Sequence, residues 1–247
     1  MPTLVLLRHG QSTWNAENRF TGWTDVDLTP LGEEEARSAG RLMADQGDLD
    51  LGIVHTSVQT RSIRTAEITL AALGRSWLPV RRHWRLNERH YGALQGLDKK
   101  ETTRQYGTEL VKAWRRGYLT PPPPLDPDDE RHARFDPRYD GVPPELLPAT
   151  ECLGDVVARL LPYFYDAIVP DLLTHPAVLV VAHGNSLRAM VKHLEGISDD
   201  DISGLDIPTG VPRLYDLDKF MVTRSARYLG DAEAIAAAQR SVAGQAG

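Results

Sequence analysis

The chain has almost no cysteine and no long hydrophobic run, and each absence excludes a class of protein. A single cysteine, Cys152, occurs among 247 residues, so no intrachain disulfide can form. This fits a reducing compartment, and we expect a cytoplasmic protein. No apolar run approaches the roughly 20 residues that a membrane-spanning helix needs. The N-terminus has no basic segment, and Arg8 interrupts its short apolar stretch, so no signal peptide is expected.

Positive charge is also scarce. The 28 lysines and arginines are outnumbered by 34 aspartates and glutamates, which gives a formal net charge of −6. This balance argues against a nucleic-acid partner, so any affinity for anions must be local. The chain also lacks zinc-ligand spacing, an HExxH motif, a P-loop and a GxGxxG motif after a strand. Metal and nucleotide sites of these types are therefore not expected.

Short apolar runs predict β-strands, and helical patterns separate most of them. The predicted strands are residues 4–7, 51–55, 80–85, 178–182 and 213–217. Helical spacing of apolar residues begins at Thr29-Pro30, near Ser57, at about Cys152 and after Asn185. With 41% hydrophobic residues, the chain can build a full α/β core. The alternation predicts a mostly parallel sheet that is covered by helices on both faces.

Three segments depart from this alternation. Residues 118–148 are rich in proline and acidic residues, so they predict a long excursion over the surface rather than a helix or central strand. Pro162 and Pro170 predict a kink or break in the helix at about residues 152–173. The alanine-rich tail at residues 230–247 predicts a weak helix or a mobile segment, after a catalytic domain at residues 1–229.

Two His-Gly motifs follow predicted buried strands at opposite ends of the chain. Arg8-His9-Gly10 comes after the first strand, and His183-Gly184-Asn185 comes after the fourth. Ligands bind at the carboxyl ends of strands in open α/β sheets, so both imidazoles are expected in one pocket. Histidine is a good nitrogen nucleophile when it is neutral. The motifs therefore predict phosphoryl transfer through His9, with His183, if protonated, stabilising the transferring group.

Further charged side chains follow the other predicted strands. Arg61 lies near a helix start, where its forked guanidinium could hold a phosphate. Glu88 could act as a general acid and base toward a substrate hydroxyl, and Arg89 and Tyr91 could hold a substrate carboxylate. The basic residues that would complete a focused positive cleft are Lys99, Arg115 and Arg116. A single His-Gly motif is weak evidence of catalysis, and it is the coincidence of several such sites at strand ends that indicates an enzyme.

These residues resemble a known family. Arg8-His9-Gly10 together with the distant His183-Gly184-Asn185 is similar to the histidine phosphatase superfamily. More specific blocks resemble the cofactor-dependent phosphoglycerate mutases, and they are residues 19–23, 86–96, 114–116 and 121–124. The resemblance extends over about residues 4–228. The chain departs from the commonest family pattern at Gln11, where glutamate is usual, and little consequence is expected.

The resemblance implies a fold and a reaction. The fold would be a three-layer α/β/α sandwich whose sheet is mostly parallel, with one antiparallel edge strand. The reaction would interconvert 3-phosphoglycerate and 2-phosphoglycerate in glycolysis and gluconeogenesis. 2,3-Bisphosphoglycerate would prime the enzyme and no metal would be needed. Relatives are commonly oligomers, so a homodimer or homotetramer is expected.

The resemblance also implies roles for individual residues. His9 would be the nucleophile, Glu88 would donate and accept the proton, and the phosphoryl group would be held by Arg8, Arg61 and His183. The implied substrate site consists of Arg8, Gly10, Gln11, Ser12, Asn15, Thr21, Gly22, Arg61, Glu88, Arg89, Tyr91, Lys99, Arg115, Arg116, Gly184 and Asn185.

Two other readings stay open. A phosphatase of the same superfamily would pass the phosphoryl group to water, whereas a mutase must position a substrate hydroxyl and exclude water. A general phosphatase has no need of Arg89, Lys99, Arg115 and Arg116, which favours the mutase. The excursion at residues 118–148 is expected to help cover the site. A binding protein without activity is disfavoured because His9, Glu88 and His183 are intact.

Overall fold

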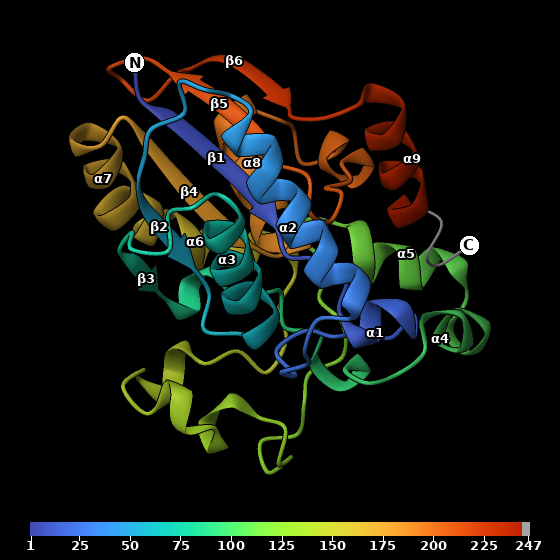
Figure 1. The fold of residues 1–247 in the computed structure, drawn as a ribbon. Helices are drawn as coiled ribbons and strands as arrows, with labels where there is room; N and C mark the ends of the chain where they lie inside the picture. Colours follow the sequence, from blue (N-terminus) through green and yellow to red (C-terminus); the bar gives the residue numbers. More distant parts are fainter. Residues whose placement is uncertain (244–247) are drawn as a thin grey trace.

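The computed structural model describes residues 1–243, and a six-stranded mixed sheet lies at its centre (Figure 1). The strand order is β3-β2-β4-β1-β5-β6. Strands β1 to β4 are mutually parallel, and β5 is antiparallel to both β1 and β6. The predicted α/β fold class is therefore confirmed. The strands are β1 (Thr3–Arg8), β2 (Leu51–Thr56), β3 (Val80–Arg82), β4 (Ala177–Ala182), β5 (Arg213–Leu217) and β6 (Thr223–Tyr228).

Five strands coincide with predicted apolar runs, and two details differ. The predicted strand at residues 80–85 ends at Arg82, because Trp84–Leu86 forms a 3-10 turn whose Arg85 N–H bonds His83 Nδ1 at 3.1 Å. Strand β6 was not predicted, and it pairs outside the reversed strand β5. Its side chains are mostly exposed, so it has none of the apolar pattern that marks a buried strand.

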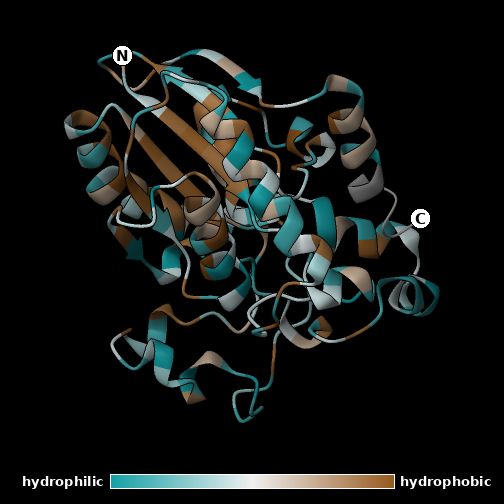
Figure 2. Ribbon diagram, viewed as in Figure 1, coloured by the Kyte–Doolittle hydropathy of each residue, from teal (hydrophilic) through white to brown (hydrophobic). Residues whose placement is uncertain are grey.

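Each central strand supplies two cores, because successive side chains point to opposite faces of the sheet. In β1, Val5 and Leu7 belong to one apolar cluster, and Leu4 and Leu6 belong to the other. Both faces are covered, so the inner parallel strands are largely hydrophobic and are mostly brown in Figure 2. One face packs on α2 (Pro30–Ala44) and α3 (Thr60–Ala72). The other packs on α6 (Leu153–Tyr163), the π-helical turn η6 (Phe164–Ile168), α7 (Val169–Thr174) and α8 (Gly184–Glu195).

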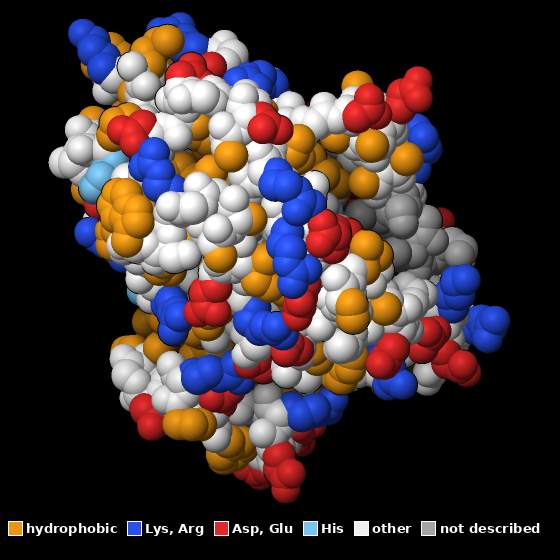
Figure 3. Space-filling model, viewed as in Figure 1, with side chains coloured by type: hydrophobic (Ala, Val, Ile, Leu, Met, Phe, Trp, Pro, Cys, Tyr) orange, Lys and Arg blue, Asp and Glu red, His pale blue; other side chains and the backbone are white. Residues whose placement is uncertain are grey.

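Local sequence explains where two of these helices begin and break. Thr29 caps α2 by accepting a hydrogen bond from Gly32 N at 3.1 Å, and Pro30 occupies the first turn as predicted. The π-helical turn separates α6 from α7 between Pro162 and Pro170, where the prolines predicted a break. The outer face of α2 carries ion pairs such as Arg37–Glu33, and Figure 3 shows charges of both signs interspersed there.

The excursion at residues 118–148 contains no α-helix or strand, as predicted, and projects below the body of the molecule in Figure 1. Side-chain packing nevertheless anchors it. Tyr139 and Ala133 are buried against Trp23, and the Trp23 and Tyr139 rings stack with centroids 4.9 Å apart. Its short 3-10 turns are η3 (Ala133–Phe135), η4 (Pro137–Tyr139) and η5 (Pro144–Leu146).

The remaining elements lie around the carboxyl ends of the strands and at the C-terminus. They are α1 (Thr13–Ala16), η1 (Trp84–Leu86), η2 (Gly92–Leu94), α4 (Lys99–Tyr106), α5 (Thr108–Arg116), η7 (Asp201–Gly204) and α9 (Ala232–Ala243). The predicted tail at residues 230–247 is thus helical over α9, while residues 244–247 lie outside the described residues, and the boundary at 229 stays a prediction. Among residues 1–243, no helix is long and apolar enough to cross a membrane.

Candidate active site

His9 and His183 lie side by side because the strands that precede them are parallel neighbours. Arg8 of β1 is in register with Ala182 of β4, so the next residue of each strand leaves the sheet at the same edge. The His9 N–H bonds Ala182 O at 3.0 Å, and the two ring centroids are 4.9 Å apart. Both side chains are buried. The topology thus creates the two-imidazole site that the sequence predicts.

The environment of His9 prepares it to act as a nucleophile. Its Nδ1 lies 2.7 Å from Gly10 O, and a carbonyl can only accept, so the proton is on Nδ1 and the lone pair is on Nε2. Burial, followed by the charges of Arg61 and Arg8, lowers the pKa of His9 well below its ordinary value. The ring is therefore neutral at neutral pH. A neutral imidazole with an available Nε2 is the form that can attack phosphorus.

The surroundings of His183 favour the neutral ring, whereas the role considered from the sequence was conditional on its protonation. Burial, then the charges of Arg61 and the neighbouring His9, lower the pKa of His183 well below its ordinary value. The Ser57 hydroxyl lies 2.8 Å from His183 Nε2 and fixes the orientation of the ring. His183 can then serve a phosphoryl group as a neutral hydrogen-bond partner.

Two arginines bring fixed positive charge to the histidines. Arg61, near the start of α3, is fully buried and donates to Gly22 O at 2.9 Å and Thr24 O at 3.1 Å. Burial lowers the pKa of Arg61 to about 10, which leaves it charged at neutral pH. Arg8 donates to Ile207 O at 2.7 Å and lines the pocket. Buried guanidinium groups of this kind are typical of phosphate sites.

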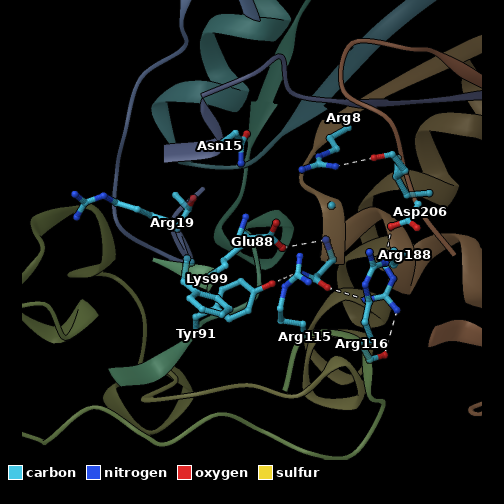
Figure 4. Close-up of a pocket in the computed structure, with 16 residues that line it drawn as sticks. Arg8, Asn15, Arg19, Glu88, Tyr91, Lys99, Arg115, Arg116, Arg188 and Asp206 are labelled. Carbon is cyan, nitrogen blue, oxygen red and sulfur yellow. Dashed lines mark hydrogen bonds and ion pairs between the residues drawn. The ribbon is translucent and has the colours of Figure 1, made fainter. Parts of the chain in front are cut away.

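Glu88 is held against the start of α8. Its Oε1 accepts hydrogen bonds from Asn185 N at 3.0 Å and Arg89 N at 2.8 Å. Its backbone is fixed as well, because Glu88 N donates to Gln59 Oε1 and Glu88 O accepts from Trp23 Nε1 at 2.6 Å. The carboxyl group forms part of the pocket wall and is drawn at its centre in Figure 4.

The pocket is strongly cationic, although the chain as a whole is acidic. Burial, then the charges of Arg115 and Arg8, lower the pKa of Lys99 to about 7. Desolvation disfavours the charged form of a buried amine, and a multiply charged anion would stabilise it. The basic side chains that line the pocket are Arg8, Arg19, Lys99, Arg115, Arg116 and Arg188 (Figure 4).

Most of the predicted substrate residues line this pocket. They are Arg8, Asn15, Thr21, Gly22, Glu88, Tyr91, Lys99, Arg115, Arg116, Gly184 and Asn185. His9, Arg61 and His183 are buried and are not in the lining. No residue of the excursion at 118–148 lines the pocket either, so the expected cover is not seen. The excursion instead contacts the segment that carries Glu88 from outside the pocket. Asn87 Nδ2 donates to the Tyr139 hydroxyl at 2.8 Å, and Tyr139 also packs on Trp23, whose indole bonds Glu88 O.

Four other predicted residues lie outside the lining and support the site instead. Gln11 N donates to Glu35 Oε2 at 2.6 Å, so Gln11 ties the loop to α2 rather than facing the pocket. A Cβ at Gly10 would lie 2.0 Å from Gly32 O, so the motif glycine permits this close approach of α2. Ser12 caps α1. Arg89 is fully buried, and its guanidinium lies 4.6 Å from the centre of the Tyr91 ring rather than at the pocket surface.

Five residues that line the pocket were not predicted from the sequence, and they are Arg19, Phe20, Arg188, Asp206 and Ile207. Arg188 follows Asn185 by three positions on α8, and its Nη1 donates to Asn185 Oδ1 at 3.0 Å, so helical spacing could have found it. Arg19 and Phe20 belong to the first specific sequence block. Asp206 forms an ion pair with Arg116 across 90 residues of chain, and no local pattern signals such a contact.

His90 makes the free energy of unfolding of the protein dependent on pH. It is fully buried, its Nδ1 accepts from Gly92 N at 3.0 Å, and burial lowers its pKa to about 3 from the ordinary 6.5. In the unfolded chain His90 binds a proton below about pH 6.5, whereas in the folded chain it does not until about pH 3. The folded state is therefore destabilised as the pH falls through this window.

We expect protonation of His90 in the unfolded chain to lower the free energy of unfolding by roughly 3 kcal/mol between pH 7 and pH 4. His90→Gln keeps an acceptor for Gly92 N but cannot be protonated, so its stability should fall less over the same range. Urea denaturation of both proteins at the two pH values measures the difference. Equal losses in the two proteins would show that His90 does not carry the effect.

Within residues 1–243, no group of three or more histidine, cysteine or acidic side chains could hold a metal ion. The expectation of a metal-independent reaction stays a prediction.

Comparison with known proteins agrees with this geometry. Residues 4–143 match the model of the histidine phosphatase superfamily (branch 1). The chain is 59% identical over 245 residues to the 2,3-bisphosphoglycerate-dependent phosphoglycerate mutase of Nitratidesulfovibrio vulgaris (strain Hildenborough), covering 99% of this chain and 98% of that protein. It is 57% identical over 246 residues to the enzyme of the same name from Thermobifida fusca, covering 99% of each chain.

Solved structures with the same fold include more distant proteins. Mycobacterial hydrolase 1 superposes with a TM-score of 0.68 at 22% identity, covering 94% of this chain and 98% of that one. A mycobacterial glucosyl-3-phosphoglycerate phosphatase in complex with VO3 gives a TM-score of 0.67 at 24% identity, covering 92% and 97%. These matches, at 22% and 24% sequence identity, establish the fold. High sequence identity over the full length, 59% and 57%, is to the mutases. The chain therefore belongs to the histidine phosphatase superfamily and, within it, to the family of 2,3-bisphosphoglycerate-dependent phosphoglycerate mutases.

Proposed function

We propose that the chain interconverts 3-phosphoglycerate and 2-phosphoglycerate through a phosphohistidine on His9, primed by 2,3-bisphosphoglycerate. The observation that carries this proposal is a neutral His9, with its lone pair on Nε2, beside a cationic pocket that Glu88 also lines. The names of the full-length relatives support the same reaction.

Priming transfers one phosphoryl group from 2,3-bisphosphoglycerate to the enzyme. His9 Nε2 attacks phosphorus, the new P–N bond forms as the P–O bond breaks, and the Glu88 carboxyl group gives its proton to the departing alkoxide oxygen. Arg8 and Arg61 stabilise the negative charge on the equatorial phosphoryl oxygens. The product is a monophosphoglycerate and phosphorylated His9.

In turnover, the phosphoryl group is first transferred in the opposite direction, from His9 to a bound monophosphoglycerate. The free hydroxyl of 3-phosphoglycerate attacks the phosphohistidine, the Glu88 carboxylate takes the hydroxyl proton, and the P–N bond breaks. The resulting bisphosphate reorients and returns its other phosphoryl group to His9, which leaves 2-phosphoglycerate. Each transfer restores the protonation state that the next one needs.

The pocket residues explain why a hydroxyl, and not water, would be the acceptor. A monophosphoglycerate carries a phosphate and a carboxylate, and these can pair with Lys99, Arg115 and Arg116. Holding both anionic groups directs the hydroxyl to phosphorus and displaces water from the pocket. A general phosphatase of this fold has no use for that second anion site, so the lining favours the mutase over the hydrolase.

The proposal extends to the pathway, the compartment, the cofactor requirement and the assembly of the enzyme. We propose that it acts in glycolysis and gluconeogenesis, in the cytoplasm and without a metal cofactor, as a homodimer or homotetramer. Light scattering during size-exclusion chromatography would measure the mass of the assembly.

A coupled assay tests the proposed reaction. Conversion of 3-phosphoglycerate to 2-phosphoglycerate is followed with EDTA present, with and without trace 2,3-bisphosphoglycerate, while released phosphate is measured. We expect rapid isomerisation that the trace primer stimulates, with little phosphate released. Phosphate release without isomerisation would assign the chain to the phosphatases, and inhibition by EDTA would contradict a metal-independent reaction.

A further inference from the structure

The segment that carries Glu88 has little regular structure of its own. It runs between the 3-10 turns η1 and η2, so side chains from elsewhere must fix its backbone. Arg159 of α6 supplies three of these contacts. Its guanidinium donates to the carbonyl oxygens of Arg85 at 2.6 Å, Asn87 at 2.9 Å and Glu88 at 3.0 Å.

Glu151 completes this support from the other end of the segment. Its Oε2 accepts a hydrogen bond from His90 N at 2.7 Å, while its Oε1 accepts from Arg159 Nε at 2.6 Å. The pair therefore holds the backbone on both sides of Glu88, from residue 85 to residue 90. We call Arg159 and Glu151 the backbone clamp.

The clamp is better suited to orienting the backbone around Glu88 than to raising the free energy of unfolding. Both side chains are buried, and a buried ion pair often contributes little net stability because its desolvation cost offsets its attraction. What an arginine offers is a rigid planar fork of five donors, which can bind several carbonyls and a carboxylate at once. Lysine has the same charge but not this geometry.

The clamp does not touch the cationic pocket. Neither residue is among those lining that pocket, and both instead line a separate cavity with Trp84, Arg85 and Leu147. Any effect of the clamp on the reaction must therefore pass through the backbone that it holds.

We infer that Arg159 and Glu151 are positioning residues for the acid–base group Glu88. The inference rests on the proposed role of Glu88 in the mutase reaction. The clamp sets where the Glu88 carboxyl group lies relative to the oxygen that it protonates, and a displacement of about 1 Å at a catalytic group can cost roughly 10²-fold in rate. The phosphate-binding residues, which lie on other segments, are unaffected.

The test is the substitution Arg159→Lys, which keeps the charge opposite Glu151 but loses the fork. With 3-phosphoglycerate we expect kcat to fall by about 10- to 100-fold, while KM stays within about twofold. With p-nitrophenyl phosphate the leaving group needs no proton. Single-turnover release of p-nitrophenolate should therefore stay within about threefold of the wild-type rate.

Two variants separate the possible explanations. Arg213 of β5 forms another arginine–glutamate ion pair, with Glu195. The substitution Arg213→Lys should leave both activities unchanged. Glu88→Gln should reproduce the selective loss in a stronger form. If Glu88→Gln loses both activities equally, the role proposed for Glu88 is wrong, and the inference falls with it.

Two results for Arg159→Lys would overturn the inference itself while Glu88→Gln behaves as expected. An equal loss with both substrates would mean that the clamp supports the whole pocket. Unchanged kinetics with both substrates would mean that the Glu88 backbone does not need it. Thermal unfolding of each variant confirms that the assays compare folded proteins.

Discussion

Replacing His9 with alanine is expected to abolish both isomerisation and phosphate release. The substitution removes the neutral imidazole whose Nε2 lone pair is available to attack phosphorus, and whose pKa the nearby charges of Arg61 and Arg8 lower. Loss of a covalent nucleophile typically costs a factor on the order of 10⁵ to 10⁶. Steady-state assays with 3-phosphoglycerate, at enzyme concentrations raised a thousandfold for the variant, would measure this loss.

A second histidine provides the matched control. His193 lies near the far end of α8 and bonds the Tyr165 hydroxyl at 2.8 Å, so His193→Ala should keep wild-type turnover. Substantial isomerisation by His9→Ala would mean that the phosphoryl group travels on another residue, or passes directly between substrate molecules. Either outcome would remove the basis of the proposed mechanism.

Replacing Glu88 with glutamine is expected to lower kcat by about 10²- to 10⁴-fold, the range for removal of a general acid–base group. The amide keeps the size of the side chain and an oxygen that can accept the bonds from Asn185 N and Arg89 N. It cannot give or take the proton. We therefore expect KM to change little, because the cationic side chains that bind the substrate remain in place.

The control for this variant is Glu67→Gln, on the exposed face of α3, where the carboxylate forms an ion pair with Arg82 at the surface. This protein should be as active as the wild type. A Glu88→Gln enzyme with unchanged kcat would require a different proton donor, and His183, which is neutral and adjacent to His9, would be the next residue to replace.

The sequence predicted the parts of the molecule that depend on local pattern. Buried parallel strands such as β1 and β4 are uninterrupted apolar runs, and their ends carry His9 and His183. Once the topology places those strands together, two histidines from opposite ends of the chain must meet. Thr29-Pro30 likewise marks the start of α2 without reference to the rest of the fold.

The parts that were missed depend on contacts between distant segments. Strand β6 is an exposed edge strand, and its side chains have no apolar alternation to announce it. Asp206 joins the pocket only through its ion pair with Arg116, which no spacing in the sequence encodes. The sequence left the protonation of His183 open, because burial and nearby cations, not residue type, set its pKa.

Residues 118–148 illustrate the same division. Their prolines correctly predicted an excursion without α-helices or central strands. Composition could not reveal that Tyr139 stacks on Trp23, or that the Trp23 indole bonds Glu88 O. The excursion therefore contacts the segment that carries Glu88 from outside the pocket. Any effect on the reaction would pass through Trp23 and through the Tyr139–Asn87 hydrogen bond rather than by closure over the substrate.

The most direct test of the account is to locate the phosphoryl group on the enzyme. The protein is incubated with 2,3-bisphosphoglycerate, digested at alkaline pH, and examined by mass spectrometry. We expect one added phosphoryl group, on the peptide containing His9, that is lost in acid. With isotopically labelled 2,3-bisphosphoglycerate, the label should leave His9 when excess unlabelled 3-phosphoglycerate is added before digestion, while the site itself stays phosphorylated. A protein that isomerises phosphoglycerates but carries no phosphoryl group on His9, or carries it on another residue, would contradict the central claim.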